Sequence, residues 1–317
     1  MDGEGAIGYS PKAMPRADRN LLRVVPSPGP EELSSLDDSL EATGLWRGEA
    51  EPPEELDGPA GPDDVYGRDE AFISSVVAPI LEALYSRWFR VEVTGWENVP
   101  RQGRCLLVSN HSGAIPWDAL MIYHALRSHM QPGRPVRFLV DKFVTRLPFI
   151  SMAAARGGFV LACRENARRL LTDDQLVGVF PEGTKGTGKL FRDRYHLARF
   201  GRGGFIEVAL ETGAPILPVA VVGAEETHPI LYKPDWLAKI FNVPYIPITP
   251  TFPLLGALGA IPLPSRFHIH FGKPLRFKPA ARRRAHDFTV VLALNKAIRA
   301  RIRGSIDELL RRRRTVF

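Results

Sequence analysis

The sequence predicts an α/β fold with a mostly parallel central sheet flanked by helices, and two observations predict it. Short runs rich in Val, Ile and Leu alternate along the chain with stretches whose apolar residues recur at helical spacing. Such continuous apolar runs are typical of strands that are buried on both faces, as in parallel sheets covered by helices. A chain of 317 residues, 44% of them hydrophobic, is long enough to bury a sheet of this kind.

The expected elements follow the alternation in order along the chain. The apolar runs predict strands at residues 105–109, 136–140, 158–162, 176–180, 215–222 and 267–272. The helical stretches lie near residues 118–129, 144–154, 164–171, 203–212 and 287–310. We see no repeat of fixed period, so a repeat architecture is not expected.

A further helix is predicted ahead of the first strand, over residues 69–90. Its apolar residues recur every four positions, Asp69 and Glu70 favour the helix start, and Pro79 predicts a kink. The uncharged part, residues 71–81, is shorter than the ~20 residues that cross a bilayer. The helix can therefore lie on a membrane but cannot span it.

The two ends of the chain differ in charge. Residues 1–66 are rich in proline and carry a net charge of −10, a composition that predicts a disordered or loosely docked tail and no secretory signal. The remaining residues carry +17, which favours an anionic partner: a membrane surface, a phosphorylated ligand or nucleic acid. The helix at 287–310 and the arginines after it are suited to anionic headgroups, although a solvated helix face is an equally common interpretation.

An uncharged stretch of unusual composition lies at residues 240–265. Its length suggests a transmembrane helix, but six prolines would break the hydrogen bonding of such a helix, and lipid tolerates no exposed broken backbone. Two interpretations remain open: a hydrophobic lip that rests on a membrane, and a buried irregular connection between strands. We accordingly divide the chain into the acidic tail (1–66), an amphipathic helical segment (67–94), the main domain (95–275) and a basic C-terminal helix with its arginine tail (276–317).

Polar residues directly follow the first buried strand. His111 comes immediately after this strand and Asp118 begins the next helix. Ligands bind at the carboxyl ends of strands in open α/β sheets, so His111 is placed to meet a substrate. A turn through Gly113 and Pro116 would fold Asp118 back onto the imidazole, where its carboxylate would fix the tautomer and support proton abstraction from a hydroxyl. A histidine that merely caps the helix is the alternative.

A second polar loop follows the strand at 176–180. Its residues are Glu182, Gly183, Thr184 and Lys185, and its glycines let backbone amides approach a phosphate while Lys185 supplies positive charge. The same stretch reads G-x-x-x-x-G-K, as in nucleotide-hydrolase phosphate loops. Because Leu190 stands where a Ser or Thr hydroxyl should bind magnesium, we do not expect a nucleotide hydrolase.

These motifs together resemble the glycerolipid and lysophospholipid acyltransferase superfamily. The blocks that carry the resemblance occur in the family's order: Asn110-His111 with Asp118, Gly158-Phe159-Val160 running to Arg164, Phe180-Pro181-Glu182-Gly183-Thr184-Lys185, and Ala214-Pro215-Ile216-Leu217-Pro218-Val219. Six residues separate His111 from Asp118 where the family usually has four, which is similar to the branch of monoacylglycerol and diacylglycerol acyltransferases. Lys185 replaces the usual arginine, so the charge remains but the bidentate fork is lost.

The resemblance implies a glycerol-3-phosphate acyltransferase-like fold over residues 95–275 and a role for each matched residue. His111 would deprotonate the acceptor hydroxyl as it attacks the thioester of acyl-CoA or acyl carrier protein, with Asp118 supporting it. The acceptor would be held by Asn110, Arg164, Glu182, Gly183, Thr184 and Lys185. No metal and no cofactor besides the acyl donor is expected.

We therefore expect an O-acyltransferase that acts on a glycerolipid or lysophospholipid. The alternative is a non-catalytic lipid-binding or membrane-tethering protein on the same fold. Two cysteines form no disulfide scaffold, so a cytoplasmic location is expected. We also expect peripheral membrane association, without a signal peptide or transmembrane helix. Nucleic acid is not an expected partner, because no recognition motif accompanies the arginines.

Overall fold

The computed structural model describes residues 46–49, 64, 66–130, 133–144, 147 and 149–317. Over these residues the chain forms a sheet of nine strands: β1 (Trp46–Glu49), β2 (Glu92–Thr94), β3 (Cys105–Ser109), β4 (Val136–Val140), β5 (Val160–Leu161), β6 (Leu176–Val179), β7 (Ile216–Val222), β8 (His268–Phe271) and β9 (Leu275–Phe277). The main path of the sheet runs β1-β9-β7-β3-β6-β4-β5, and β8 pairs with both β2 and β7. The predicted α/β class is confirmed.

The central strands are parallel, as their composition predicts. β3 pairs in parallel with β6 and β7, and β4 pairs in parallel with β5 and β6. β3 and β7 are completely buried, in agreement with their continuous apolar sequences. Antiparallel pairing occurs toward one edge, where β8 and β9 both pair with β7.

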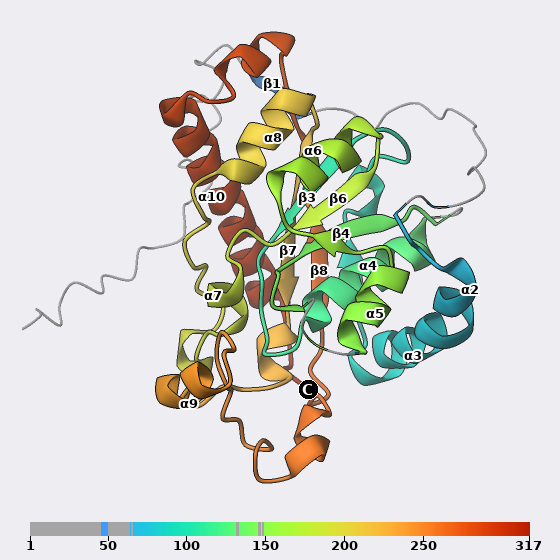
Figure 1. The fold of residues 1–317 in the computed structure, drawn as a ribbon, viewed down its shortest axis with the longest axis vertical. Coiled ribbons are helices and arrows are strands. Elements are labelled where there is room, and N and C mark those ends of the chain that lie inside the picture. Colours follow the sequence, from blue (N-terminus) through green and yellow to red (C-terminus); the bar gives the residue numbers. More distant parts are fainter. Residues whose placement is uncertain (1–45, 50–63, 65, 131–132, 145–146, 148) are drawn as a thin grey trace, which may run out of the picture.

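Helices cover both faces of the sheet (Figure 1). The α-helices of four or more residues among the described residues are α3 (Ala78–Ala83), α4 (Trp117–His129), α5 (Ile150–Arg156), α6 (Arg164–Thr172), α7 (Thr184–Thr187), α8 (Gly204–Thr212), α9 (Asp235–Ile240) and α10 (Phe288–Arg312). On one face, α6, α8 and α10 form an apolar core with every second residue of β3, β6 and β7. On the other face, α4 and the N-terminal helical segment share a core with the alternate residues of the same strands. The chain passes to different layers after β3 and after β6, and this difference positions the polar loops described next.

The connections after β3 and β6 create a crevice at the carboxyl edge of the sheet. The chain leaves β3 toward α4 on one face and leaves the neighbouring β6 toward α8 on the other. Adjacent parallel strands whose connections part in this way form the ligand-binding crevice of open α/β sheets. Both polar loops singled out from the sequence begin at this crevice.

The N-terminal helix forms where it is predicted, with a change in its hydrogen bonding around Pro79. The short α2 (Glu70–Phe72) continues into a π-helical segment at Ile73–Val77, and α3 then begins just before the proline. Because proline has no N–H to donate, the wider π turn accommodates its ring without a helix break. A second π segment, Leu84–Trp88, ends the helix.

Two described parts of the predicted tail contact the domain, and one predicted helix begins later than expected. Trp46–Glu49, inside the predicted disordered tail, form β1 and pair with β9 through backbone hydrogen bonds, which need no apolar periodicity. Asp64, also assigned to the tail, forms an ion pair with Arg137 of β4 at 2.5 Å. Most of the predicted tail lies outside the described residues. The helix expected at 144–154 begins only at Ile150, because Phe149 has φ of 64°, outside the helical region.

Among the described residues, no helix is both long enough and apolar enough to cross a bilayer. The proline-rich stretch at 240–265 begins at the last residue of α9 and otherwise contains a 3₁₀ helix, Gly256–Ala260, a single β-bridge residue, Ile248, and irregular backbone. α10 does not stand apart from the domain, since its apolar face packs on β7 and joins the core.

Candidate active site

His111 and Asp118 are in direct contact at the carboxyl end of β3. The Nδ1 atom of His111 lies 2.8 Å from Oδ2 of Asp118. Asp118 is fully buried, and it also accepts hydrogen bonds from the backbone N–H groups of Ser112 and Ala119, both at 2.8 Å. A carboxylate fixed by these three donors holds the Nδ1 proton in place, which leaves Nε2 of His111 to accept a proton.

The turn that joins these two residues depends on Gly113. Its φ is 86°, and a Cβ atom built there would lie 2.7 Å from the carbonyl oxygen of Ala224. Both the left-handed backbone and this close approach exclude a larger residue. The predicted fold-back of Asp118 onto His111 is therefore confirmed as geometry.

The imidazole ring of His111 is oriented by an aromatic neighbour as well. It stacks on Phe180, with ring centroids 4.2 Å apart and an interplanar angle of 23°. Phe180 in turn stacks on Phe138 of β4 at 5.4 Å. The His111 side chain keeps 15% of its surface exposed, so solvent or a substrate can reach it.

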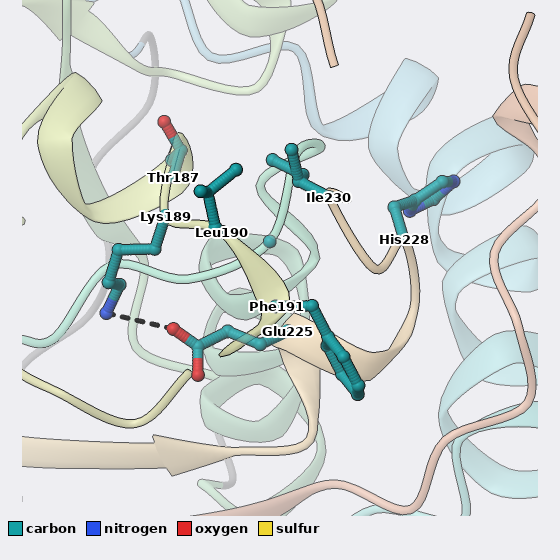
Figure 2. A pocket seen from close by; sticks show the side chains of 8 residues that line it. Thr187, Lys189, Leu190, Phe191, Glu225, His228 and Ile230 are labelled. Atoms are coloured by element: carbon teal, nitrogen blue, oxygen red, sulfur yellow. Dashed lines mark ion pairs between the residues drawn. The ribbon is translucent and has the colours of Figure 1, made fainter. Parts of the chain in front are cut away.

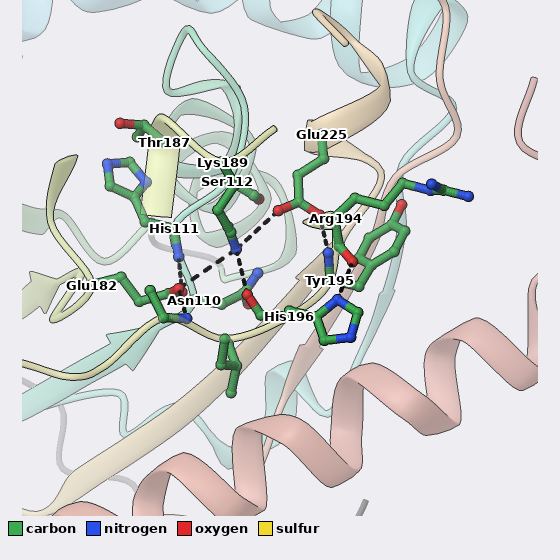
Figure 3. Close-up of polar contacts among 12 residues, drawn as sticks. Asn110, His111, Ser112, Glu182, Thr187, Lys189, Arg194, Tyr195, His196 and Glu225 are labelled. Atoms are coloured by element: carbon green, nitrogen blue, oxygen red, sulfur yellow. Dashed lines mark hydrogen bonds and ion pairs between the residues drawn. The ribbon is translucent and has the colours of Figure 1, made fainter. Parts of the chain in front are cut away.

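Glu182 lies next to His111 but faces protein groups (Figure 3). Its Oε1 accepts the backbone N–H of His111 at 3.0 Å, and its Oε2 accepts the backbone N–H of Ala198. Because the side chain is fully buried, neither oxygen is free for an acceptor. Glu182 thus connects the loop after β3 to the loop after α7, a position that differs from the acceptor-binding role its motif suggests.

A buried lysine supports Glu182 from the other side (Figure 3). Lys189 Nζ lies 2.9 Å from Oε1 of Glu225 and 3.5 Å from Oε2 of Glu182. Burial disfavours the ammonium, but the two carboxylates outweigh burial and raise the pKa of Lys189 above its ordinary value. Lys189 is the residue that completes the G-x-x-x-x-G-K pattern, and here it binds carboxylates of its own chain.

Asn110 also has its side-chain amide occupied. Its amide nitrogen donates to the carbonyl of Val221 at 2.9 Å, and its amide oxygen accepts the N–H of Val221 at 2.8 Å. Both groups are buried, and they continue the pairing of β3 with β7 beyond the last residue of β3. The contacts indicate a structural role and do not support the expected contact with substrate.

The remaining predicted site residues lie at the crevice with different surroundings. Gly183 has φ of 56°, and no atom lies within 4 Å of the place where a Cβ would stand, so its backbone conformation favours glycine while space does not require it. Thr184 and Lys185 begin α7, and the Lys185 side chain is exposed. Arg164, at the start of α6, forms an ion pair with Glu207 of α8 at 2.7 Å, so it is engaged with that helix.

α7 packs tightly against His111 because of a glycine. A Cβ atom at Gly186 would lie 2.7 Å from the carbonyl oxygen of His111 and 2.8 Å from its Cβ. This contact brings Lys185, the neighbouring residue, to the same loop pair as His111 and Asp118. Four predicted residues, His111, Asp118, Glu182 and Lys185, therefore belong to one cluster of loops.

Tyr245 is a site neighbour that the sequence motifs do not reveal. Its hydroxyl donates to the carbonyl of Ala114 in the loop after β3 at 3.3 Å, and its ring lies close to Gly188. Burial raises the pKa of Tyr245 to about 12, and the charge of Asp118 acts in the same direction. Tyr245 lies in the uncharged proline-rich stretch, where no chemical pattern marks it.

A small pocket opens beside this cluster (Figure 2). It is lined by Gly113 of the loop after β3 together with Thr187, Lys189, Leu190, Phe191, Glu225, His228 and Ile230. Burial lowers the pKa of His228, so its imidazole is neutral at neutral pH. The pocket is far too small to hold a whole acyl donor.

Comparison with known proteins identifies the family. A family model described as Acyltransferase matches residues 90–222, which include both polar loops. Uncharacterized protein Rv0502 of Mycobacterium tuberculosis is 45% identical over 254 residues, which cover 80% of this chain and 71% of that protein. The chain belongs to the acyltransferase family. The enzyme class expected from the motifs is thereby confirmed.

Two more distant relatives of this acyltransferase carry functional names. The human protein named DGAT1/2-independent enzyme synthesizing storage lipids is 25% identical over 206 residues, covering 64% of this chain and 59% of that protein. The 1-acyl-sn-glycerol-3-phosphate acyltransferase of Borreliella burgdorferi is 26% identical over 149 residues, covering 44% and 54%. The described residues contain no cluster of three or more His, Cys, Asp or Glu side chains suited to a metal ion.

Proposed function

We propose that this acyltransferase moves a fatty acyl group from a thioester donor, acyl-CoA or acyl carrier protein, to a hydroxyl of a glycerolipid or lysophospholipid. The observation that carries the proposal is the contact of His111 Nδ1 with Asp118, which leaves Nε2 as a base at the carboxyl edge of the sheet. The names of the two distant relatives favour glycerolipid acceptors.

The proposed reaction is a direct transfer without a covalent acyl-enzyme. Nε2 of His111 takes the proton of the acceptor hydroxyl while the hydroxyl oxygen attacks the thioester carbonyl carbon. Asp118 stabilises the imidazolium that forms. When the tetrahedral intermediate collapses, the C–S bond breaks and the departing thiolate takes the proton from His111. The products are an ester and a free thiol, and the histidine returns to its starting state with no metal or redox cofactor involved.

Glu182 and Asn110 serve this reaction indirectly in the proposal. Glu182 holds the backbone of His111, and Asn110 holds the end of β3 against β7. Gly183, Thr184 and Lys185 remain on the accessible side of the crevice, where Lys185 is the cation available to a phosphate of the acceptor or donor. A phosphorylated acceptor would use this charge, whereas a neutral glycerolipid would not.

The test is acyl transfer from labelled long-chain acyl-CoA by the purified protein on anionic vesicles. Lysophosphatidate, monoacylglycerol and diacylglycerol are offered in parallel, and His111→Ala and Lys185→Met are compared with the wild type. We expect product with at least one acceptor and none with His111→Ala. A selective loss of lysophosphatidate acylation in Lys185→Met would identify the phosphorylated acceptor.

The opposite result would also be informative. If His111→Ala retains the wild-type rate, the His/Asp mechanism is wrong. If the wild type binds vesicles and transfers no acyl group from acyl-CoA or acyl carrier protein to any of these acceptors, the proposed substrate class is wrong.

A further inference from the structure

The surface of the molecule carries one segment with an unusual concentration of exposed apolar side chains. We call residues 231–261 the lip. Nine large apolar side chains of the lip are between 50% and 83% exposed: Leu231, Tyr232, Trp236, Ile240, Phe241, Leu254, Leu255, Leu258 and Ile261. Scattered single apolar residues are normal on a soluble surface, but nine in one short segment are a concentration that favours contact with another apolar phase.

The lip is a built structure. At its base, the N–H of Leu263 donates to the carbonyl of Thr227 at 2.9 Å, and His228 contacts the carbonyl of Ala260 at 3.2 Å. Within it, Tyr232 and Ile248 form an antiparallel bridge. These hydrogen bonds hold the backbone that carries the exposed apolar side chains. Residues of the same types are buried in the core elsewhere in the chain.

The lip adjoins the proposed reaction site. Tyr245, near its middle, donates a hydrogen bond to the carbonyl of Ala114 in the loop that carries His111. Lys233 donates to the carbonyl of Gly188, next to α7. The pocket beside Lys189 is lined by Ile230, immediately before the lip begins. A molecule held by the lip thus lies next to the loops around His111.

The composition of the lip fits the outer part of a bilayer. The charged residues of the lip are Lys233, Asp235 and Lys239, all in its first part, and residues 240–265 carry none, whereas residues 67–317 carry a net charge of +17. An apolar tip on a cationic body is complementary to acyl chains lying beneath anionic headgroups. The irregular backbone argues for shallow insertion, because backbone groups without partners are not tolerated in the hydrocarbon core.

We propose that the lip inserts into the headgroup and acyl boundary of an anionic bilayer and presents membrane lipid directly to the His111 loop. This inference rests on the proposed function only in that the presented lipid is the acyl acceptor. Contact between the lip and a bilayer is a separate property. Figure 1 places the lip, which includes α9, at one end of the molecule and the start of α10 at the opposite end.

That arrangement provides a matched control. The test variant is Leu254→Ser, Leu255→Ser and Leu258→Ser combined, three exposed residues of the lip. The control is Phe288→Ser with Leu292→Ser, which are also exposed but belong to the start of α10. Each full-length protein is sedimented with vesicles of phosphatidylcholine alone or with about a third phosphatidylglycerol. Since one buried leucine side chain is worth about tenfold in partitioning, the triple variant should bind at least about 100-fold more weakly.

A second measurement locates the contact. Brominated acyl chains quench a tryptophan that enters the lipid, and we expect Trp236→Phe to remove most of the quenchable fluorescence while leaving vesicle binding within about threefold of the wild type. Normal vesicle binding by the triple serine variant would overturn the proposal, as would an equal loss in the α10 control. Conversion of a wild-type dimer to monomer by the triple variant, without any change in vesicle binding, would overturn it as well and assign the lip to self-association.

Failure of the proposed function gives a different result. If the wild type transfers no acyl group but the triple variant alone loses vesicle binding, the lip assignment stands and the reaction does not. If the lip assignment and the proposed acyl transfer are both correct, the triple variant should lose transfer to an acceptor carried in vesicles. It should retain the wild-type kcat with a water-soluble short-chain acceptor.

Discussion

Replacing Lys189 by methionine should destabilise the protein strongly, and more so at higher pH. Methionine has nearly the same length as the lysine stem but carries no charge, so Lys189→Met leaves Glu182 and Glu225 without the cation that now lies 3.5 and 2.9 Å away. The three side chains are 10%, 0% and 6% exposed, respectively, so water replaces little of the lost interaction. Removing one partner of a buried ion pair costs about 3–5 kcal/mol.

The sign of the pH dependence follows from Glu225. Burial already raises the pKa of Glu225 above its ordinary value, with Lys189 opposing that shift. Without the lysine the pKa rises further, and the unfolded chain binds a proton less readily than the folded one. The contribution of Glu225 is then fully present below its unfolded pKa and is lost as pH rises through the folded pKa. The deficit of Lys189→Met should therefore be larger at about pH 8 than at about pH 5.

Chemical denaturation at both pH values, with thermal melts in parallel, measures this deficit. A loss of this size should lower the melting temperature by roughly 10 °C at the higher pH. Lys239→Met, at an exposed lysine, should change the stability by less than about 0.5 kcal/mol. A deficit below about 1 kcal/mol that does not change with pH would refute the assignment of Lys189 as a buried, charged support for the two glutamates.

Three further changes test the individual contacts. Asp118→Asn should lower kcat by about 10²–10⁴-fold with little change in KM, because asparagine no longer holds the Nδ1 proton; an unchanged kcat in steady-state assays would contradict this. Asn110→Ala should lower the free energy of unfolding by about 1–3 kcal/mol, since it leaves the N–H and carbonyl of Val221 unpaired, and a neutral result in urea titrations would exclude that role. Gly186→Ala should lower kcat strongly and the melting temperature only slightly, because the added methyl displaces His111. A parallel fall in kcat and in melting temperature would indicate general unfolding and not a local displacement.

Local geometry explains which parts of the site the sequence predicts. His111 and Asp118 are seven positions apart, and the turn between them needs only the strand end, Gly113 and the next helix start. Glu182 and Lys185 are likewise placed at the crevice by the strand before them. Their proximity to His111 follows because β3 and β6 are parallel neighbours, so the loops after both strands meet at one edge of the sheet.

Long-range contacts explain what the sequence leaves out. Lys189 and Glu225 are joined across the fold, and no motif connects them. Glu182 sits in a motif that implies acceptor binding, yet its oxygens are used by two backbone groups that only the folded chain brings together. β1 escapes prediction because an edge strand of four residues is held by backbone pairing, which leaves no period in the side chains.

The C-terminal helix shows why counting charges does not locate a membrane surface. Asn295, Arg299 and Arg303 of α10 recur every four residues, so they share one helix face. They donate, in turn, to the carbonyls of Phe200, of Leu197 and Ala198, and of Tyr195. These residues form the loop after α7.

That loop leads directly to the site. The N–H of Ala198 donates to Glu182, and Glu182 accepts the N–H of His111. Arg299 is therefore linked to the loop of the proposed base through the backbone of Ala198 and the carboxylate of Glu182. The arginines of this face thus bind the loop that positions Glu182. In our proposal we therefore assign the membrane-facing side from the apolar exposure of the lip and not from the basic helix.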